Sequence, residues 1–408
     1  MKIIEKLNTK GLLQDYSDTE KIDSLKKGDK FYVGFDPTAK SLQLGNLVPL
    51  ITAIRLSELG LKPIILFGGA TAAIGDPSGK SEERPILERS EIENNINNQK
   101  SKVTEILSRF NINCEFVNNI DWTQNINIID FLRDTGKHFP LSYMISKEVI
   151  KTRLNSSGIS FTEFTYMLLQ ANDFYHLYKK HDCKLQIGGS DQWGNITAGL
   201  ELIRRKGIND ASAFSMPLIT DSNGKKFGKT NDGALWLDSA LTSPYKMHQF
   251  LLNVSDQDVL NFIKIFTFLS DEEIVELERE IKENPAKRAS QKRLADEITK
   301  IIHGDKKTEF AKKSAKVLFG GALDGLKVPS CSIEKDLLSE FTNIDLLINS
   351  KSCSSKGEAK RLIKNGGAYF NGKRINDSES QVEKNIYDNK KLIILRTGKK
   401  SYTLVKLL

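Results

Sequence analysis

The sequence predicts an α/β protein built on a mainly parallel β-sheet, followed by an α-helical domain and a small α+β domain. Three observations support this division of the 408 residues. Over residues 1–242, short apolar strands alternate with helical patterns, which is typical of βαβ units. Residues 243–320 show helical periodicity only. Residues 321–342 contain glycine and proline and are expected to be a linker, whereas residues 343–408 combine short helices with strands.

The strands of the first domain are expected from short apolar runs. Residues 30–35 and 62–67 are rich in β-branched and aromatic side chains. Between them, residues 42–59 have a helical pattern that Gly60 ends. The remaining expected elements are a helical lead-in at 1–29, helices at 90–110, 161–180 and 196–206, and strands at 114–117, 185–187 and 213–220.

The stretch 186–195 is the most informative in the chain. An apolar strand ends at Gly188 and Gly189, and a polar segment with Asp191 and Gln192 precedes the next helix. Ligands of open α/β sheets bind at the carboxyl ends of the strands. Glycines there allow the backbone to approach a ligand, and polar side chains can recognise its hydroxyl or ammonium groups. A tight turn with a polar helix cap would use the same residues.

Two other turns carry side chains suited to phosphate or sugar. Lys226 and Lys229 flank small, flexible residues, so their ammonium groups can reach a phosphate. The glycine-rich turn that contains Asp76 lacks the G-x-G-x-x-G spacing of dinucleotide sites. With Lys80 and Arg84, it could still hold a sugar or phosphate. Taken alone, both signals also fit solvated surface loops.

Composition indicates a cytoplasmic protein with no membrane partner. The chain lacks a run of about 18 apolar residues, and its N-terminus lacks the hydrophobic segment of a signal peptide. The 4 cysteines are scattered without a C-x-x-C pair. This spacing argues against a zinc site or a disulfide framework and fits a reducing compartment.

The excess positive charge lies in the C-terminal segment. Residues 343–408 hold 14 Lys/Arg and 6 Asp/Glu, which leaves 46 of each in the remainder, because the whole chain has 60 and 52. A basic module on a neutral body suggests a polyanionic partner, most simply nucleic acid. A solubilising tail is the alternative.

Together these stretches resemble the bacterial-type tyrosyl-tRNA synthetases, which are class I aminoacyl-tRNA synthetases. The resemblance covers essentially the whole chain and rests on Y-V-G-F-D-P-T at 32–38, G-D-P-S-G-K at 75–80, Q-I-G-G-S-D-Q-W-G-N at 186–195 and K-F-G-K-T at 226–230. It implies a Rossmann-like catalytic domain over 1–242, an anticodon-binding helical domain over 243–320 and an S4-like RNA-binding domain over 343–408.

The resemblance also implies an activity. This family activates L-tyrosine with ATP to tyrosyl-adenylate, releases pyrophosphate, and transfers tyrosine to the 3′ end of tRNA(Tyr). ATP, Mg²⁺, tRNA(Tyr) and a second copy of the chain are therefore the expected partners. Because the attacking carboxylate is already ionised, catalysis should come from positioning the reactants and stabilising charge at the phosphate.

Roles are carried over to the residues at matching positions. Tyr32 and Asp173 would bind the phenol hydroxyl, and Tyr166, Gln170 and Asp76 the ammonium group. Tyr166, Gln170 and Asp173 also follow i, i+4, i+7 spacing and should share one helix face. The expected sets are Lys226, Lys229, Gln43, Asn46 and Thr38 for catalysis; Tyr32, Asp76, Tyr166, Gln170, Asp173 and Gln186 for tyrosine; Gly34, Asp36, Gly45, Gly188, Asp191, Gln192 and Lys229 for ATP or adenylate; and Arg204, Arg205, Lys356, Lys360, Arg361, Lys364, Lys373 and Arg374 for tRNA.

One segment departs from the family pattern. The class I signature His-x-Gly-His falls at residues 43–46, which are Gln-Leu-Gly-Asn. Asn46 keeps a donor, and the Gln43 amide has two N–H donors but no imidazolium charge. A catalytically weakened RNA-binding homologue is therefore one alternative. A tryptophan-specific enzyme of the same fold is another, although Tyr32 and Asp173 disfavour an indole, which offers only an N–H donor.

Overall fold

The computed structural model describes residues 2–76, 87–155, 158–230, 233–318, 329–371, 373–388, 392–398 and 401–408. The chain forms two compact units, Met1–Gly304 and Asp305–Leu408, and each encloses a hydrophobic core. The helices that follow the first sheet belong to the same unit as the sheet. The division of the chain into functional domains remains a prediction.

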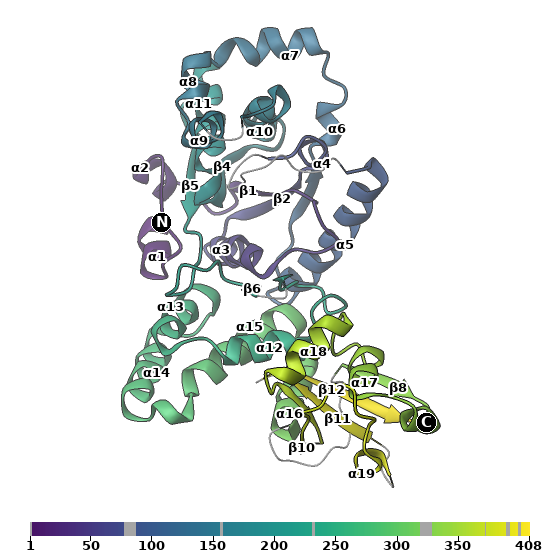
Figure 1. The fold of residues 1–408 in the computed structure, drawn as a ribbon. Helices are drawn as coiled ribbons and strands as arrows, with labels where there is room; N and C mark the ends of the chain where they lie inside the picture. The colour runs from purple at the N-terminus through teal and green to yellow at the C-terminus, as the bar shows by residue number, and fades with distance from the viewer. Residues whose placement is uncertain are drawn as a thin grey trace. The chain divides into compact units, whose positions relative to one another are not determined.

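The first unit is built on a parallel sheet (Figure 1), and its strand order is β3-β2-β1-β4-β5. Its strands are β1 (Lys30–Phe35), β2 (Lys62–Phe67), β3 (Glu115–Asn118), β4 (Cys183–Gly189) and β5 (Ser212–Met216). The predicted α/β class with a parallel sheet is confirmed. The strand order reverses between β1 and β4, and such a switch point opens a crevice at the carboxyl ends of the strands.

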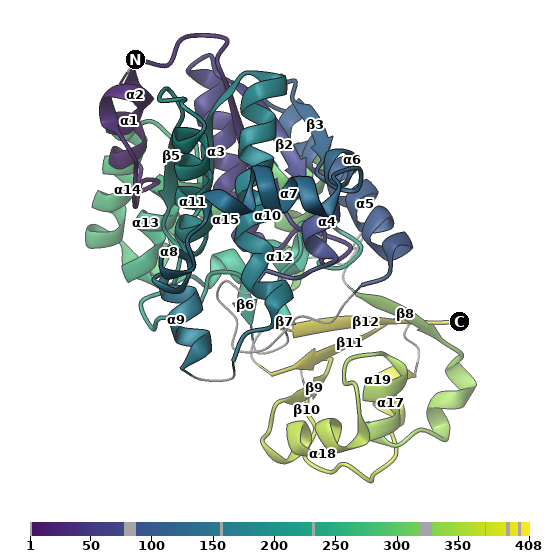
Figure 2. The same ribbon diagram turned by 90° about the horizontal axis from the view of Figure 1, so that it is seen from above.

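Long helices cover both faces of this sheet. They are α3 (Leu47–Glu58), α5 (Arg89–Ser108), α10 (Phe161–His181) and α11 (Trp193–Arg205). Tyr32 and Ile64 belong to the core that includes residues of α10 and α11, which lie side by side (Figure 2). Val33 and Ile65 point the other way, into the core with α3 and α5. This alternation follows from the two-residue period of a strand, and both faces are apolar because both are covered.

Shorter helices complete the sheet part of the unit. They are α1 (Ile3–Thr9), α2 (Thr19–Asp23), α4 (Gly69–Ala72), α6 (Ile120–Thr123), α7 (Ile128–Asp134), α8 (Leu141–Ile145) and α9 (Glu148–Leu154), with short 3₁₀ turns at Leu44–Asn46, Gly136–His138 and Ser190–Gln192. The pair β6 (Lys229–Thr230) and β7 (Gly233–Ala234) follows β5. The predicted strand 213–220 was too long at its end. β5 stops at Met216 because Pro217 has no N–H to donate to a ladder.

Helices alone make up the end of the first unit. They are α12 (Pro244–Leu252), α13 (Asp256–Phe266), α14 (Asp271–Glu283) and α15 (Ala289–His303), with a 3₁₀ turn at Pro285–Lys287. Phe262 and Phe266 of α13 are buried in the same core as α3. The lysine-rich loop before β6 is therefore anchored between the sheet and these helices, since Phe227 also packs in this core.

The second unit begins with α16 (Asp305–Leu318) and contains a sheet of order β10-β9-β11-β12-β8. Its elements are β8 (Ser330–Ile333), α17 (Asn343–Asn349), α18 (Lys356–Lys364), β9 (Ala368–Phe370), β10 (Lys373–Arg374), α19 (Lys384–Tyr387), β11 (Leu392–Thr397) and β12 (Ser401–Leu407), with a 3₁₀ turn at Lys335–Ser339. The expected linker 321–342 is wrong from Ser330 onward, because β8 pairs in parallel with β12. A single short strand that pairs far along the chain gives little local signal.

Candidate active site

A cavity of about 440 Å³ lies at the carboxyl ends of β1 and β4. Its walls come from β1 and the following turn, the start of α3, the turn after α4, α10, the end of β4 and the loop before β6. All the residues expected for tyrosine, ATP and catalysis line it: Tyr32, Gly34, Asp36, Thr38, Gln43, Gly45, Asn46, Asp76, Tyr166, Gln170, Asp173, Gln186, Gly188, Asp191, Gln192, Lys226 and Lys229. Segments far apart in sequence thus meet at one site.

A buried polar pair closes one part of this cavity. The Tyr32 side chain is 2% exposed, and its hydroxyl has no hydrogen-bond partner among the described residues. Burial raises the pKa of this phenol well above its usual value, and the nearby Asp173 carboxylate raises it further. Asp173 is also 2% exposed, and burial raises its pKa to about 7. The pair therefore offers a hydroxyl without a partner beside a carboxylate.

Two residues that sequence reasoning missed hold the Asp173 carboxylate. Trp122 Nε1 donates to Asp173 Oδ1 at 2.8 Å, and Asn119 Nδ2 donates to Oδ2 at 3.0 Å. These bonds oppose the effect of burial on the Asp173 pKa. Asn119 directly follows β3, and Trp122 lies on α6, the helix that comes next. Because parallel strands end at a common edge, the end of β3 was the position at which to look for them.

A second carboxylate, Asp36, lies at the end of β1. Tyr166 Oη donates to Asp36 Oδ2 at 2.8 Å, and Thr71 Oγ1 donates to Asp36 Oδ1 at 2.7 Å. Thr71 was also missed. Burial, followed by the Asp36 and Asp76 charges, raises the pKa of Tyr166 well above its usual value. Asp76 accepts a 2.6 Å hydrogen bond from Gln192 Nε2. Two carboxylates thus bring negative charge to this side of the cavity.

One face of α10 supplies three of the lining residues. Tyr166, Gln170 and Asp173 all face the cavity, as their spacing predicts. The helix begins at a capping box between Ser160 and Glu163. Arg153 forms a buried ion pair with Glu163 at 2.8 Å, which ties α9 to the first turn of α10.

Cations lie at the mouth of the cavity. Lys226 and Lys229 are exposed, and Lys229 Nζ donates to Gln43 Oε1 at 2.9 Å. The Gln43 backbone N–H donates to Asn46 Oδ1 at 2.9 Å. The turn Leu44–Asn46 leads directly into α3, so this polar group lies at a helix N-terminus, where anions are favoured.

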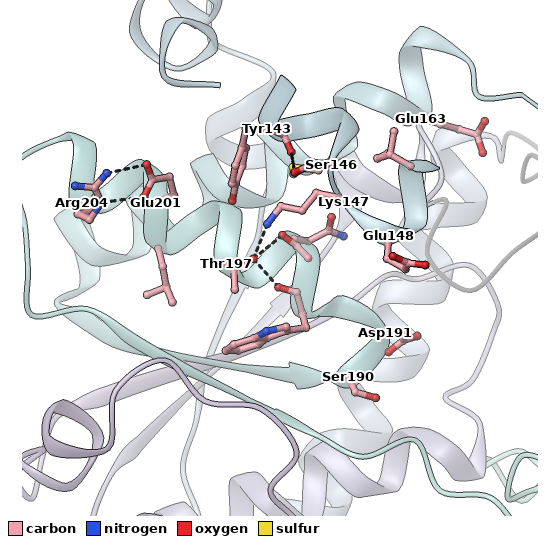
Figure 3. A pocket seen from close by; sticks show the side chains of 16 residues that line it. Tyr143, Ser146, Lys147, Glu148, Glu163, Ser190, Asp191, Thr197, Glu201 and Arg204 are labelled. Atoms are coloured by element: carbon pink, nitrogen blue, oxygen red, sulfur yellow. Dashed lines mark hydrogen bonds and ion pairs between the residues drawn. The ribbon is translucent and has the colours of Figure 1, made fainter. Parts of the chain in front are cut away.

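A second hollow of about 920 Å³ lies between α8, α9, α10 and α11. Figure 3 shows Tyr143, Lys147 and Thr197 pointing toward one another within it. Lys147 Nζ donates to Thr197 Oγ1 at 2.9 Å and lies 4.3 Å from the centre of the Tyr143 ring. Asp191 lines both this hollow and the first cavity, and Trp193 lines the hollow.

The residues expected to bind tRNA are basic groups on the surface. Arg204 and Arg205, at the end of α11, both form ion pairs with Glu201. In the second unit, Lys356, Lys360, Arg361, Lys364, Lys373 and Arg374 are all exposed. Lys360 pairs with Glu379 at 2.7 Å, and Lys373 with Glu383 at 2.6 Å.

Within the described ranges, no group of three or more His, Cys, Asp or Glu side chains is placed to hold a metal ion. No helix in those ranges combines the length and apolar character needed to span a bilayer. Lys80 and Arg84 lie outside the described residues.

Comparisons with known proteins identify the family of the chain. Residues 26–320 match the family model of class I tRNA synthetases (W and Y), and residues 324–405 match that of the tyrosine–tRNA ligase SYY-like C-terminal domain. The chain is 44% identical to tyrosine–tRNA ligase of Oceanobacillus iheyensis, over 100% of this chain and 99% of that protein. It is 43% identical to tyrosine–tRNA ligase 1 of Bacillus subtilis, over 99% of each. A truncated mitochondrial tyrosyl-tRNA synthetase from Aspergillus nidulans superposes with a TM-score of 0.71 at 29% identity, covering 78% of this chain and 94% of that one.

Proposed function

The chain belongs to the class I tyrosine–tRNA ligases, and on that premise we propose how its cavity activates tyrosine. The family joins tyrosine to tRNA with ATP as substrate. The roles of individual residues, the use of Mg²⁺, the oligomeric state and a cytoplasmic location are proposals.

Recognition of the phenol rests on Tyr32 and Asp173. The buried, unpartnered Tyr32 hydroxyl is the single observation that carries this proposal. A buried polar group without a partner is costly, and a ligand hydroxyl at this position removes the cost. The substrate phenol donates to the Asp173 carboxylate and accepts from Tyr32. Phenylalanine leaves the Tyr32 hydroxyl unpaired and gives the Asp173 carboxylate no further donor, so the pocket rejects it. Trp122 and Asn119 hold the carboxylate in place.

Recognition of the amino group rests on the acidic side of the cavity. The Asp36 and Asp76 carboxylates and the Gln170 amide attract and accept hydrogen bonds from the substrate ammonium group. The Tyr166 hydroxyl fixes Asp36 through their 2.8 Å bond. Gln186, whose buried amide oxygen has no partner among the described residues, also accepts from the substrate. Gly34 and Gly188 let the substrate lie close to the backbone.

Activation of ATP rests on the residues at the cavity mouth. The tyrosine carboxylate attacks the α-phosphorus, and Lys226 and Lys229 bind the departing pyrophosphate. Gln43, Asn46 and Thr38 donate hydrogen bonds to phosphate oxygens, and Gly45, Asp191 and Gln192 contact the adenylate. Mg²⁺ would bind the ATP phosphates and neutralise part of their charge.

The second hollow is our candidate route for the 3′ end of the tRNA. It shares Asp191 with the first cavity, and its lining includes Arg204, Lys147 and the Trp193 ring. Cations bind phosphates, and aromatic rings stack on unpaired bases. The exposed cations of α18 and β10 contact other tRNA phosphates.

A homodimer is supported by exposed apolar side chains. Ile128 on α7, Leu141 on α8 and Phe161 at the start of α10 are 70%, 66% and 78% exposed. Where such side chains form one patch, they usually mark an interface. Sedimentation of the purified protein, compared with an Ile128→Ser/Leu141→Ser variant, checks this proposal.

Tyrosine-dependent exchange of pyrophosphate into ATP is the direct test of the proposed chemistry. Exchange with tyrosine, but not with phenylalanine or tryptophan, is the expected result. Exchange with tryptophan instead would overturn the proposal that Tyr32 and Asp173 recognise the phenol hydroxyl. No exchange, with tRNA binding intact, would favour an RNA-binding protein without this chemistry.

A further inference from the structure

The lysine-rich loop is held against the turn that contains Gln43. The Phe227 ring lies 4.6 Å from Phe262 and 4.7 Å from Phe266, between ring centres. Gly228 has φ +83°, and a Cβ there would lie 2.8 Å from the Leu44 Cβ, so the loop approaches the turn closely. These contacts fix the position of the backbone from which the Lys229 side chain extends.

The backbone ties the same two segments together. Leu235 N–H donates to the Gly228 carbonyl at 2.9 Å, and Leu44 N–H donates to the Leu235 carbonyl at 2.8 Å. Leu237 N–H donates to the Leu42 carbonyl at 2.9 Å. The segment after the loop therefore runs along the turn and joins the two, so the Lys229–Gln43 bond forms within a connected backbone framework.

The partner of Gln43 determines which way its amide faces. A lysine ammonium has only donors, so the atom that meets Lys229 Nζ at 2.9 Å must be the amide oxygen. The amide nitrogen then points away, and within the described part of the chain it donates to no protein group. Asn46 is held in the same manner, because its oxygen accepts the Gln43 backbone N–H.

We propose that Lys229 orients the Gln43 amide so that Gln43 and Asn46 present only N–H donors to the phosphates of ATP. This inference rests on the proposed function and adds a role for Lys229 beyond its own charge. Both amide oxygens, which would repel phosphate, are occupied by protein donors. Two neutral amides thus replace the two histidines of the class I signature without needing a protonated ring.

The substitution Gln43→Glu separates this role from a merely structural one. The carboxylate keeps the shape of the side chain and bonds Lys229 at least as well as the amide, but it has no donor for phosphate. If Gln43 only holds the loop, Gln43→Glu, which keeps the bond to Lys229, should be more active than Gln43→Met, which loses it. If Gln43 is an oriented donor, kcat for pyrophosphate exchange falls by about 100-fold or more, while KM for tyrosine is unchanged.

Two further variants complete the test. Gln43→Met, which loses both the donor and the bond to Lys229, should lower kcat less than Gln43→Glu, because it brings no negative charge to the phosphates. In a Lys229→Met background, Gln43→Met should cost less than in the native chain, because the amide is no longer oriented. Gln257→Glu, an exposed change on α13, is the matched control and should have no effect. Equal effects of Gln43→Met in both backgrounds, or a fully active Gln43→Glu, would overturn the proposal.

Binding of inorganic pyrophosphate by the full-length variants gives a readout that does not depend on turnover. We expect calorimetry to show at least about tenfold weaker binding for Gln43→Glu than for the native chain. Equal binding would contradict an oriented donor even if the native chain catalyses exchange. Absence of exchange by the native chain would instead count against the proposed function.

Discussion

In the unit Met1–Gly304 the polar side chains assigned to tyrosine are buried or half-buried, whereas in Asp305–Leu408 the groups assigned to the polyanion are exposed cations. Asp173 accepts two hydrogen bonds in a buried site, where water screens its charge little. Lys360 lies in solvent and already has an acidic neighbour. We therefore expect a single hydrogen bond to matter in the first unit, and the second unit to act through the sum of many weak contacts.

Removing the unit Asp305–Leu408 should have the largest effect, because it separates pyrophosphate exchange from tRNA charging. We expect a chain ending at Gly304 to keep pyrophosphate exchange within about twofold and to lose tRNA charging by at least about 100-fold, since phosphate contacts add up. The cut belongs at Gly304 because a cut at residue 343 would leave β8 without its partner β12. Exchange and charging measured on the same preparation check this. Equal loss of both would mean that the units do not act separately.

The next largest effect is expected from a substitution within the buried site. Asp173→Asn should lower kcat/KM for tyrosine by about 10- to 100-fold, because a hydrogen bond to a charged group is worth about 1.5–3 kcal/mol. Phenylalanine makes no such bond, so kcat/KM for phenylalanine should be unchanged. Discrimination between tyrosine and phenylalanine should therefore fall. Exchange kinetics with both amino acids measure the ratio, and Asp121→Asn, an exposed change on α6, is the control. Unchanged selectivity would refute the proposal that Asp173 recognises the substrate phenol.

The raised pKa of Asp173 predicts a pH dependence of tyrosine binding. Burial raises this pKa to about 7, so the carboxyl is increasingly protonated as the pH falls below that value. In the proposed site the substrate phenol donates to the ionised form of Asp173, so the affinity for tyrosine should weaken on acidification, toward about tenfold per pH unit. Titration calorimetry from pH 5.5 to 8, a range of about 2.5 units, shows whether the affinity for tyrosine weakens as the pH falls. In Asp173→Asn this dependence should vanish; its persistence would assign it to another group.

Single changes in the second unit should have the smallest effects. Arg361→Ala should weaken tRNA binding by about two- to fivefold and reduce the salt slope by about 1. Lys360→Ala should do less, because Lys360 is already paired with Glu379 at 2.7 Å. Filter binding at several salt concentrations compares them. A larger loss for Lys360→Ala than for Arg361→Ala would point to a specific contact rather than summed charge.

Local signals decided how much the sequence could predict. The bounds of β1 and β2 were predicted correctly because buried parallel strands are continuous apolar runs between turns. The cavity lining was predicted because its motifs end strands or begin helices, where chain direction fixes a common edge. Asn119 and Trp122 were missed because their role depends on Asp173, a partner more than 50 residues away in the chain. The pairing of β8 with β12 is non-local in the same way.

The bond between Trp122 and Asp173 has an optical consequence. The Trp122 indole stacks on His176 with ring centres 4.3 Å apart and donates to Asp173, the carboxylate that we propose binds the substrate phenol. Indole emission depends on its hydrogen bonding and on nearby quenchers such as an imidazole. Occupancy of the tyrosine pocket should therefore be visible as a change in intrinsic fluorescence, without any attached dye. The chain has 3 tryptophans, so Trp193→Phe and Trp236→Phe would isolate this signal.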